Sequence, residues 1–184
     1  MGIHGRRPAV FLDRDGVINR AVIRDGKPYP PASVASVELV TDAAQVLNGI
    51  KSAGYLVIVV TNQPDVARGT QSRAVVEAIH DYLSSVLPID DFRCCYHDDC
   101  DRCHCRKPKP GLILDAARAH EVDLSASVMV GDRWSDVEAG RRAGCRTVFI
   151  DCGYTERKPD APDLVVRTLS DARDWIVAFT PGRK

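Results

Sequence analysis

The sequence predicts an α/β fold in which helices cover both faces of a doubly wound, mostly parallel sheet. Apolar segments rich in β-branched residues alternate along the chain with segments whose apolar residues recur at helical spacing. Several of the apolar segments are nearly continuous, which is typical of strands buried on both faces. Polar residues that can bind ligands follow the ends of these segments, as expected at the ligand-binding edge of such a sheet.

The predicted elements begin with a strand at 9–12, where four apolar residues precede two acids and a glycine. A proline-rich stretch at 20–31 is expected to be a loop that could wall a site. The remaining elements of this Rossmann-like alternation are strands at 55–60, 92–96, 128–130, 147–151 and, at the sheet edge, 163–166, and helices at 41–53, 72–86, 111–120 and 170–179.

Length and composition favour one domain spanning residues 1–184, because 184 residues that are 45% hydrophobic can bury one core but hardly two. Lysine plus arginine equals aspartate plus glutamate at 25 each, so no global charge attracts nucleic acid or an anionic membrane. No apolar run is long enough to cross a bilayer. We therefore expect a cytoplasmic protein, a monomer, that acts on a small molecule.

Two aspartates, Asp13 and Asp15, close the first predicted strand and precede Gly16. Because side chains two apart on an extended backbone point the same way, both carboxylates can face one small volume beyond the strand. Two acids placed there repel each other unless a cation lies between them. Mg²⁺ prefers oxygen ligands, so the sequence predicts a magnesium site.

Three polar residues, Thr61, Asn62 and Gln63, follow the predicted strand at 55–60. The hydroxyl and the amides can donate hydrogen bonds to a phosphate at the same edge of the sheet. These residues are candidates for substrate binding.

Two further acids follow the strand at 128–130. Asp132 lies at the turn itself and is the better candidate for a metal ligand. Asp136 lies one helical turn later and could orient Asp132 or cap the helix. We expect Asp132 to complete the magnesium site with Asp13 and Asp15.

Five of the seven cysteines fall between residues 94 and 105. Three thiolates and one imidazole in this segment make a complete set of tetrahedral zinc ligands: Cys95, His97, Cys103 and Cys105. Because all four positions are filled by the protein, the set implies a structural ion. In a reducing compartment such a group holds metal more readily than it forms disulfides. Possible substitutes in the same segment are Cys94, Cys100 and His104, so the choice of four is weaker than the prediction of Zn²⁺ itself.

A basic segment that includes Arg106 and Lys107 follows the cysteines directly. The loop holds few apolar residues, so a bound metal rather than packing would fix its backbone and direct Lys107. A cation is needed where a phosphoryl group and aspartates crowd negative charge together. We take Lys109 to be solvated.

The pattern resembles the haloacid dehalogenase superfamily of phosphohydrolases. Asp13-x-Asp15, Thr61, Lys107 and Asp132 match its four motifs in order. The lack of a separate cap domain and the zinc loop ahead of Lys107 narrow the resemblance to two related groups, the D-glycero-D-manno-heptose 1,7-bisphosphate 7-phosphatases and the histidinol-phosphate phosphatases.

Within that pair, Thr61-Asn62-Gln63, the Ala-Arg-Gly at 67–69 and the Gly-Lys-Pro-Tyr at 26–29 resemble the heptose enzymes. The sequence departs from their usual pattern at Pro64-Asp65 and at Arg133, where lysine is common. These residues could touch the substrate, so the departures put its identity in doubt more than the reaction.

The resemblance implies that Asp13 is the nucleophile and Asp15 the general acid and base. It also implies that Mg²⁺ is held by Asp13, the backbone carbonyl of Asp15 and Asp132, while Thr61 and Lys107 hold phosphate oxygens. The expected substrate-binding residues are Asn62, Gln63, Arg106 and Arg133.

Two other readings remain open at this point. Histidinol phosphate or another small sugar phosphate is the alternative substrate. A zinc-dependent nucleic-acid-binding module is the alternative of a different class, although the charge balance and the 6% aromatic content argue against it.

Overall fold

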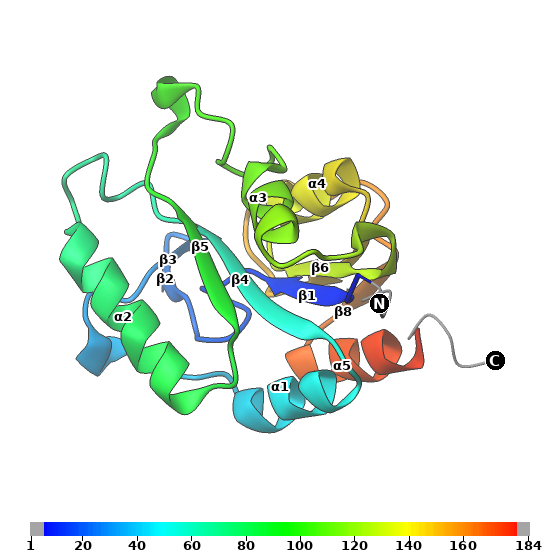
Figure 1. Ribbon diagram of the computed structural model, residues 1–184. Helices are drawn as coiled ribbons and strands as arrows, with labels where there is room; N and C mark the ends of the chain where they lie inside the picture. Colours follow the sequence, from blue (N-terminus) through cyan, green and yellow to red (C-terminus); the bar gives the residue numbers. More distant parts are fainter. Residues whose placement is uncertain (1–5, 180–184) are drawn as a thin grey trace.

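A six-stranded parallel sheet forms the centre of the molecule, with strand order β5-β4-β1-β6-β7-β8 (Figure 1). The computed structural model describes residues 6–179. The strands of this sheet are β1 Ala9–Leu12, β4 Leu56–Asn62, β5 Asp91–Cys95, β6 Val128–Gly131, β7 Arg146–Ile150 and β8 Leu164–Val166. The helices are α1 Ala43–Ser52, α2 Arg73–Val86, α3 Gly111–Ala119, α4 Trp134–Ala143 and α5 Leu169–Ala178.

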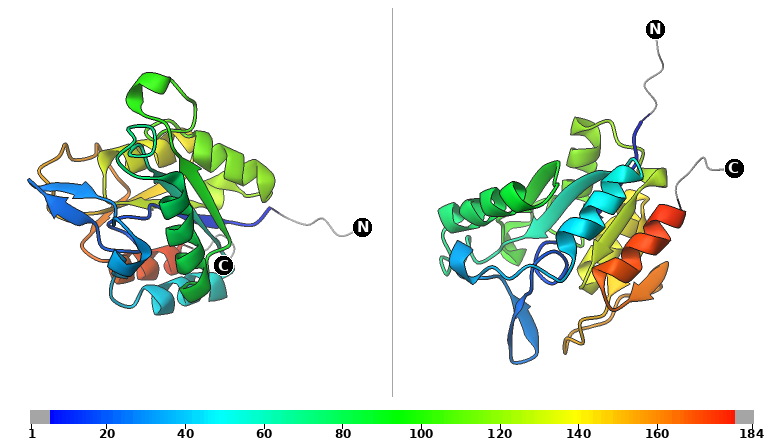
Figure 2. Two further views of the ribbon diagram at one scale, coloured as in Figure 1. Left: turned by 90° about the vertical axis from the view of Figure 1, so that its left-hand side faces the viewer. Right: turned by 90° about the horizontal axis from the view of Figure 1, so that it is seen from below.

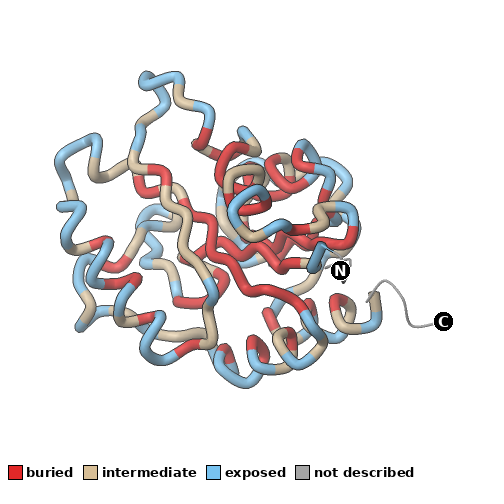
Figure 3. Tube along the Cα trace, viewed as in Figure 1, coloured by how far each residue is buried: buried red, intermediate tan, exposed pale blue. Residues whose placement is uncertain are grey.

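Helices cover the sheet on both faces, which confirms the predicted fold class. Helices α1, α2 and α5 pack on one face and α3 and α4 on the other (Figures 1 and 2). Alternate residues of β1 serve the two faces, because Val10 and Leu12 join the core beneath α1 while Phe11 joins the core beneath α3. Strands β1 and β6 are therefore buried along their whole length, and β4 is buried up to Thr61 (Figure 3).

The strand β4 continues two residues beyond the predicted end. Thr61 and Asn62 still pair with Cys94 and Cys95 of β5. Both polar residues are thus held in the regular geometry of the sheet rather than in a loop. The other predicted strands and helices occur within two residues of the predicted bounds, and β8 is the edge strand.

The prediction of a plain loop at 20–31 is wrong. The segment contains an antiparallel hairpin of β2 Val22–Arg24 and β3 Lys27–Tyr29, hereafter the hairpin. Pro28 is tolerated in β3 because a two-stranded ribbon leaves one side of each strand without a ladder partner. Three short 3₁₀ helices were also not predicted: η1 Val34–Ser36, η2 Asp99–Asp101 and η3 Leu124–Ala126.

Among residues 6–179, no helix combines the length and the apolar character that a membrane crossing requires. The five residues at each end of the predicted domain 1–184 lie outside the described part of the chain.

Helix α4 approaches the sheet closely at Gly140. A Cβ atom at this position would lie 2.5 Å from the Cβ of Met129 and 3.0 Å from Cγ2 of Thr147. The Cβ of Met129 cannot move without shifting the backbone of β6. At Gly49 of α1, by contrast, the nearest atom to an added Cβ is Cδ of Arg173 at 3.2 Å, and that side chain is flexible.

The same substitution at these two glycines should therefore have opposite effects. We expect Gly140→Ala to lower the free energy of unfolding by about 1–3 kcal/mol, because it overpacks the contact between α4 and β6. Gly49→Ala should raise it by about 0.5–1 kcal/mol through helix propensity. Urea denaturation followed by circular dichroism measures both, and a Gly140→Ala variant as stable as the wild type would contradict the close packing.

Candidate active site

Three neighbouring strands bring the predicted motif residues together at the carboxyl edge of the sheet. Asp13 follows β1, Thr61 lies near the end of β4, and Asp132 follows β6. Because β1 lies between β4 and β6, all three side chains meet at one edge. The backbone of Asp13 is fixed by its N–H, which donates to the carbonyl of Val130 at 3.0 Å.

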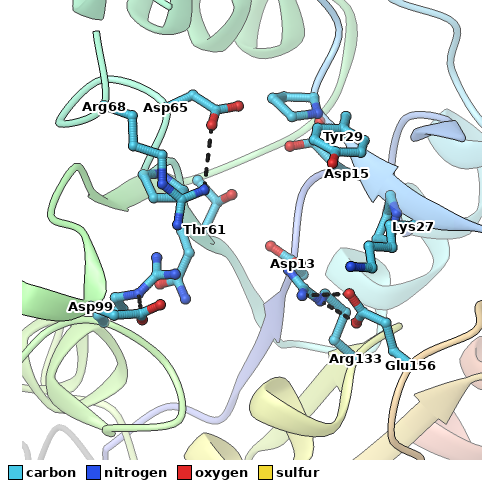
Figure 4. A pocket seen from close by; sticks show the side chains of 15 residues that line it. Asp13, Asp15, Lys27, Tyr29, Thr61, Asp65, Arg68, Asp99, Arg133 and Glu156 are labelled. Carbon is cyan, nitrogen blue, oxygen red and sulfur yellow. Dashed lines mark hydrogen bonds and ion pairs between the residues drawn. The ribbon is translucent and has the colours of Figure 1, made fainter. Parts of the chain in front are cut away.

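A pocket of about 320 Å³ opens beside Asp13 and Thr61 (Figure 4). The hairpin, the chain after β4 and the segment after β5 form its walls. The lining residues are Asp13, Asp15, Lys27, Pro28, Tyr29, Pro30, Thr61, Asn62, Pro64, Asp65, Arg68, Asp99, Arg106, Arg133 and Glu156. Proline-rich residues of the 20–31 segment thus do wall the site.

The ammonium of Lys107 lies between two carboxylates. Its Nζ is 2.9 Å from Oδ1 of Asp13 and 2.6 Å from Oδ1 of Asp136, and it donates to the carbonyl of Val60 at 2.7 Å. All three charged side chains are nearly inaccessible, with residue exposures of 4% for Lys107, 7% for Asp13 and 0% for Asp136. The structure therefore brings Lys107 to Asp13, as the sequence predicts, and also to Asp136.

Asn62 holds the backbone of Lys107 in place. Its Nδ2 donates to the Lys107 carbonyl at 3.1 Å, and its Oδ1 accepts from the Lys107 N–H at 3.1 Å. Both ends of the Asn62 amide are therefore engaged within the protein, although the residue lines the pocket. The substrate contact that the sequence indicates for Asn62 stays a prediction, and the structure adds a clamp on the backbone of Lys107.

The buried charges around Lys107 perturb one another. Burial raises the pKa of Asp13 to about 6, an effect that Lys107 opposes and Asp136 reinforces. Burial by itself would lower the pKa of Lys107, but Asp13 and Asp136 raise it to about 12. The lysine is therefore a fixed positive charge at neutral pH, and Asp13 is mostly ionised.

Asp132 completes a group of three acids, hereafter the acidic centre of Asp13, Asp132 and Asp136, in which each residue offers an oxygen within 4.8 Å of the others. Both carboxylate oxygens of Asp132 are buried and make no regular hydrogen bond within the described residues. Burial, Asp13 and Asp136 raise its pKa well above the ordinary value, although the Tyr154 hydroxyl lies close enough to oppose the rise.

The composition of the acidic centre suits a divalent cation. Three carboxylates surround the single ammonium of Lys107, so the fully ionised acidic centre carries two negative charges in excess, and the raised pKa of Asp132 reflects both burial and this excess. Oxygen ligands of this kind are those that Mg²⁺ prefers. Gly16 allows the close approach, because a Cβ on its backbone, where φ is +91°, would lie 1.9 Å from Oδ2 of Asp132.

The carboxylate of Asp15 is held by several donors. Arg14 donates from Nε to Oδ1 at 3.1 Å and from Nη2 to Oδ2 at 2.8 Å. Asn19 and Gln63 donate through their amide nitrogens at 2.9 and 2.8 Å. Burial would raise the pKa of Asp15, but Arg14 and these hydrogen bonds lower it. Asp15 is therefore held as a carboxylate.

Gln63 is oriented inward rather than into the pocket. Its exposure is 1%, and its Nε2 also donates to Oγ1 of Thr61 at 3.0 Å. The structure thus connects Gln63 with Asp15 and Thr61 as a supporting residue. The predicted residues Asp13, Asp15, Thr61, Asn62, Arg106 and Arg133 line the pocket, whereas Gln63, Lys107 and Asp132 lie behind its wall.

Arg14 is fully buried, and besides its bonds to Asp15 its guanidinium group donates a hydrogen bond to His80 of α2. Nη1 of Arg14 lies 3.1 Å from Nε2 of His80, whose ring stacks on Phe92 with a centroid distance of 4.6 Å. Burial and the neighbouring Arg14 lower the pKa of His80 to about 4. The imidazole is therefore neutral near pH 7 and serves as a hydrogen-bond acceptor.

Arg106 and Arg133 are both paired with acids at the pocket. Nε of Arg106 donates to Asp99 at 2.6 Å, and Arg133 donates two hydrogen bonds to Glu156 at 2.8 and 2.7 Å. Both predicted substrate-binding arginines therefore lie where a pocket ligand can reach them, with their guanidinium groups already oriented.

The predicted zinc ligands also come together, as a group that we call the cysteine–histidine cluster: Cys95, His97, Cys103 and Cys105. The Sγ atom of Cys95 lies 3.1 Å from that of Cys105 and 3.7 Å from that of Cys103, and Nδ1 of His97 lies 3.3 Å from Sγ of Cys105. Metal–ligand bonds of about 2.0–2.3 Å in a tetrahedron separate the ligand atoms by roughly 3.3–3.8 Å. The donor set could therefore hold zinc with small adjustments.

The possible substitutes for these ligands lie outside the cluster. Cys94 points away from Cys95 on β5, Cys100 is exposed, and His104 pairs with Asp115 at 3.2 Å. All seven cysteines fall within the described residues and are free thiols.

The predicted capping role of Asp136 is confirmed, because its Oδ2 accepts from the Arg133 N–H at 3.0 Å at the start of α4. Sequence reasoning missed the ion pair of Asp136 with Lys107 and the roles of Arg14 and His80. The helical-turn spacing of Asp136 from Asp132 placed a second acid at the site but did not show that it would pair with Lys107. Nothing in the local sequence indicates that Arg14 is buried, because an arginine after a strand is ordinarily exposed.

Comparison with known proteins agrees with this geometry. Residues 104–172 match a family described as HAD-hydrolase-like. The D-glycero-alpha-D-manno-heptose-1,7-bisphosphate 7-phosphatase of Photorhabdus laumondii is 32% identical over 179 residues, which cover 90% of this chain and 94% of that protein. The chain belongs to the heptose-1,7-bisphosphate 7-phosphatase family of haloacid dehalogenase-like hydrolases. The predicted resemblance is thus confirmed, and this is a family of phosphoric monoester hydrolases.

Two further members of the heptose-1,7-bisphosphate 7-phosphatase family extend the comparison. The D-glycero-beta-D-manno-heptose-1,7-bisphosphate 7-phosphatase of Rhodopseudomonas palustris is 40% identical over 151 residues, covering 76% of this chain and 81% of that protein. The crystal structure of D,D-heptose 1,7-bisphosphate phosphatase from B. bronchiseptica, complexed with magnesium and phosphate, is 28% identical with a TM-score of 0.75, covering 93% of this chain and 98% of that one. Relatives of both anomeric preferences therefore occur.

The pKa of His80 has a measurable consequence for stability. The unfolded chain binds a proton at His80 near pH 6.5, whereas the folded protein binds it only near pH 4. Between these values unfolding takes up a proton, so the free energy of unfolding decreases as the pH falls, by up to about 1.4 kcal/mol per pH unit from this group. The contribution is fully present above pH 6.5.

His80→Gln keeps an acceptor for Arg14 but cannot titrate. We expect urea denaturation at pH 7.0, 6.0 and 5.0 to show a shallower loss of stability for this variant than for the wild type. Equal slopes for the two proteins would show that His80 is not held neutral by the fold.

Proposed function

We propose that this protein hydrolyses the 7-phosphate of D-glycero-D-manno-heptose 1,7-bisphosphate. The observation that carries the proposal is the convergence of Asp13, Thr61, Lys107 and Asp132 at one edge of the sheet, beside a pocket, in a chain of this family. Relatives named for this reaction supply the substrate class. A small phosphorylated sugar is the expected partner.

In the proposed reaction, an oxygen of Asp13 attacks phosphorus in line. The bond between phosphorus and the sugar oxygen breaks, and that oxygen takes a proton from Asp15. The aspartyl-phosphate on Asp13 is then attacked by water, whose proton passes to Asp15, and phosphate leaves. Asp15 is held as a carboxylate by Arg14 and Gln63, the state needed for the second step, and must be protonated for the first.

The residues around Asp13 would stabilise the charge that develops on the phosphoryl group. The ammonium of Lys107 lies 2.9 Å from Asp13, so it can contact a group attached to that carboxylate. The Thr61 hydroxyl is a second donor. Asn62 then acts by positioning Lys107 and Gln63 by positioning Asp15, while Arg106 and Arg133 contact the substrate.

Magnesium is the proposed catalytic cofactor. Asp13, Asp132 and the backbone carbonyl of Asp15 would hold it, and the unbalanced negative charge of the acidic centre supports this assignment. When bound, it supplies a positive charge that offsets the charge of the phosphoryl oxygens.

Zinc is the proposed structural cofactor, held by the cysteine–histidine cluster. Cys105 lies two residues before Lys107, so order imposed on the cluster passes directly to the lysine. Thiolate ligands require a reducing compartment, which supports a cytoplasmic location.

A substrate panel tests the function. We expect the wild type to release phosphate with Mg²⁺ from one anomer of heptose 1,7-bisphosphate in preference to fructose 1,6-bisphosphate and histidinol phosphate. Asp13→Asn removes the nucleophile with little change in shape, so it should lower kcat by about 10⁴-fold or more while leaving the circular dichroism spectrum unchanged. A preference for histidinol phosphate, or appreciable turnover by Asp13→Asn, would overturn the proposal.

Two cysteine variants test the structural metal. Cys103→Ser should lower zinc from about one equivalent per chain to near zero and kcat by about 10-fold or more, because the segment that delivers Lys107 loses its support. Cys100→Ser, an exposed thiol in the same segment, is the matched control and should keep both values. Metal analysis by mass spectrometry and phosphate release measure the two effects. Zinc retained in full by Cys103→Ser would exclude the proposed ligand set.

A further inference from the structure

The basic side chains that line the pocket differ in whether they have an acidic partner. There are four of them among the described lining residues, and the three arginines are all paired. The pairs are Arg68–Asp98 at 2.6 Å, Arg106–Asp99 at 2.6 Å and Arg133–Glu156 at 2.7 Å. Lys27 of the hairpin is the fourth, and within residues 6–179 it forms no ion pair. Figure 4 shows its side chain extending from the hairpin into the pocket.

The backbone next to Lys27 is fixed although the side chain is exposed. The carbonyl of Gly26 accepts from the N–H of Thr155 at 3.0 Å and from its hydroxyl at 3.2 Å. Gly26 has φ of +73°, and a Cβ there would lie 2.5 Å from Oγ1 of Thr155. Lys27 also pairs with Arg24 across the hairpin. The tip of the hairpin is thus attached to the chain that carries Glu156, another residue that lines the pocket.

We infer that Lys27 determines specificity by binding the phosphate of the bisphosphate substrate that is not removed. The inference rests on the proposed function, because it assumes a substrate with a second phosphate at the other end of the sugar. With the first phosphate at Asp13, the second lies elsewhere in the same pocket, which Lys27 also lines.

Charge pairing explains why Lys27 rather than an arginine supplies this contact. A phosphate that takes a guanidinium group from its carboxylate must replace interactions already formed, and it also brings its own negative charge next to that carboxylate. Arg68, Arg106 and Arg133 all carry this cost. Lys27 does not, and an ammonium is an effective point charge for phosphate.

The preference for a bisphosphate over a monophosphate tests the inference. Wild type, Lys27→Met, Lys27→Arg and Arg24→Gln are compared on heptose 1,7-bisphosphate and on heptose 7-phosphate with Mg²⁺. We expect Lys27→Met to lower the ratio of the two kcat/KM values by about 10- to 100-fold, mainly through a higher KM for the bisphosphate, because a charge-assisted contact to a non-reacting group is lost. Lys27→Arg should restore most of the ratio, and Arg24→Gln, which removes a charge from the same hairpin outside the pocket lining, should keep it.

The outcomes separate this inference from the proposed function. An unchanged ratio in Lys27→Met, or an equal fall in kcat/KM on both substrates, would overturn the role of Lys27 and leave the phosphatase assignment standing. A similar fall in this ratio for Arg24→Gln would also overturn the role of Lys27, because the effect would then come from the net charge of the hairpin. A wild type that releases phosphate from neither substrate would overturn the proposed function itself, and the inference with it.

Discussion

The buried ammonium of Lys107 joins parts of the chain that are far apart in sequence. It contacts Asp13 after β1, Asp136 in α4 and the carbonyl of Val60 in β4. Removing charges from water is costly, and the ion pairs of Lys107 with Asp13 and Asp136 offset part of that cost. The edge of the sheet, the helix α4 and the loop after the cysteines must therefore keep fixed positions relative to one another for these contacts to form.

The loop that carries Lys107 lacks the apolar residues that fix the strands. Its position depends instead on polar supports, namely the amide of Asn62 and the cysteine–histidine cluster just before it. Asp15 is supported in a similar way by Arg14 and Gln63. Lys107 and Asp15, the residues proposed to act on the phosphoryl group, are thus each held by neighbouring side chains that limit their freedom before substrate binds.

Most of the architecture could be predicted from the local sequence. Continuous apolar runs marked the strands, and the acids at 13, 15 and 132 followed from the rule that parallel strands end at one edge. The clamp by Asn62 and the burial of Arg14 could not be predicted, because each depends on a partner about 45 to 66 residues away. The hairpin was hidden by Pro28, which local propensity counts against a strand.

The hairpin has one more consequence. Its two strands pair only with each other, and neither belongs to the six-stranded sheet that holds Asp13, Thr61 and Asp132. Replacing or lengthening the hairpin would therefore change one wall of the pocket without breaking any hydrogen bond of the six-stranded sheet. Under the proposed function, the residues that act on the phosphate and the residue that selects the substrate therefore lie on separate structural units, so the two properties can change independently in evolution or by design.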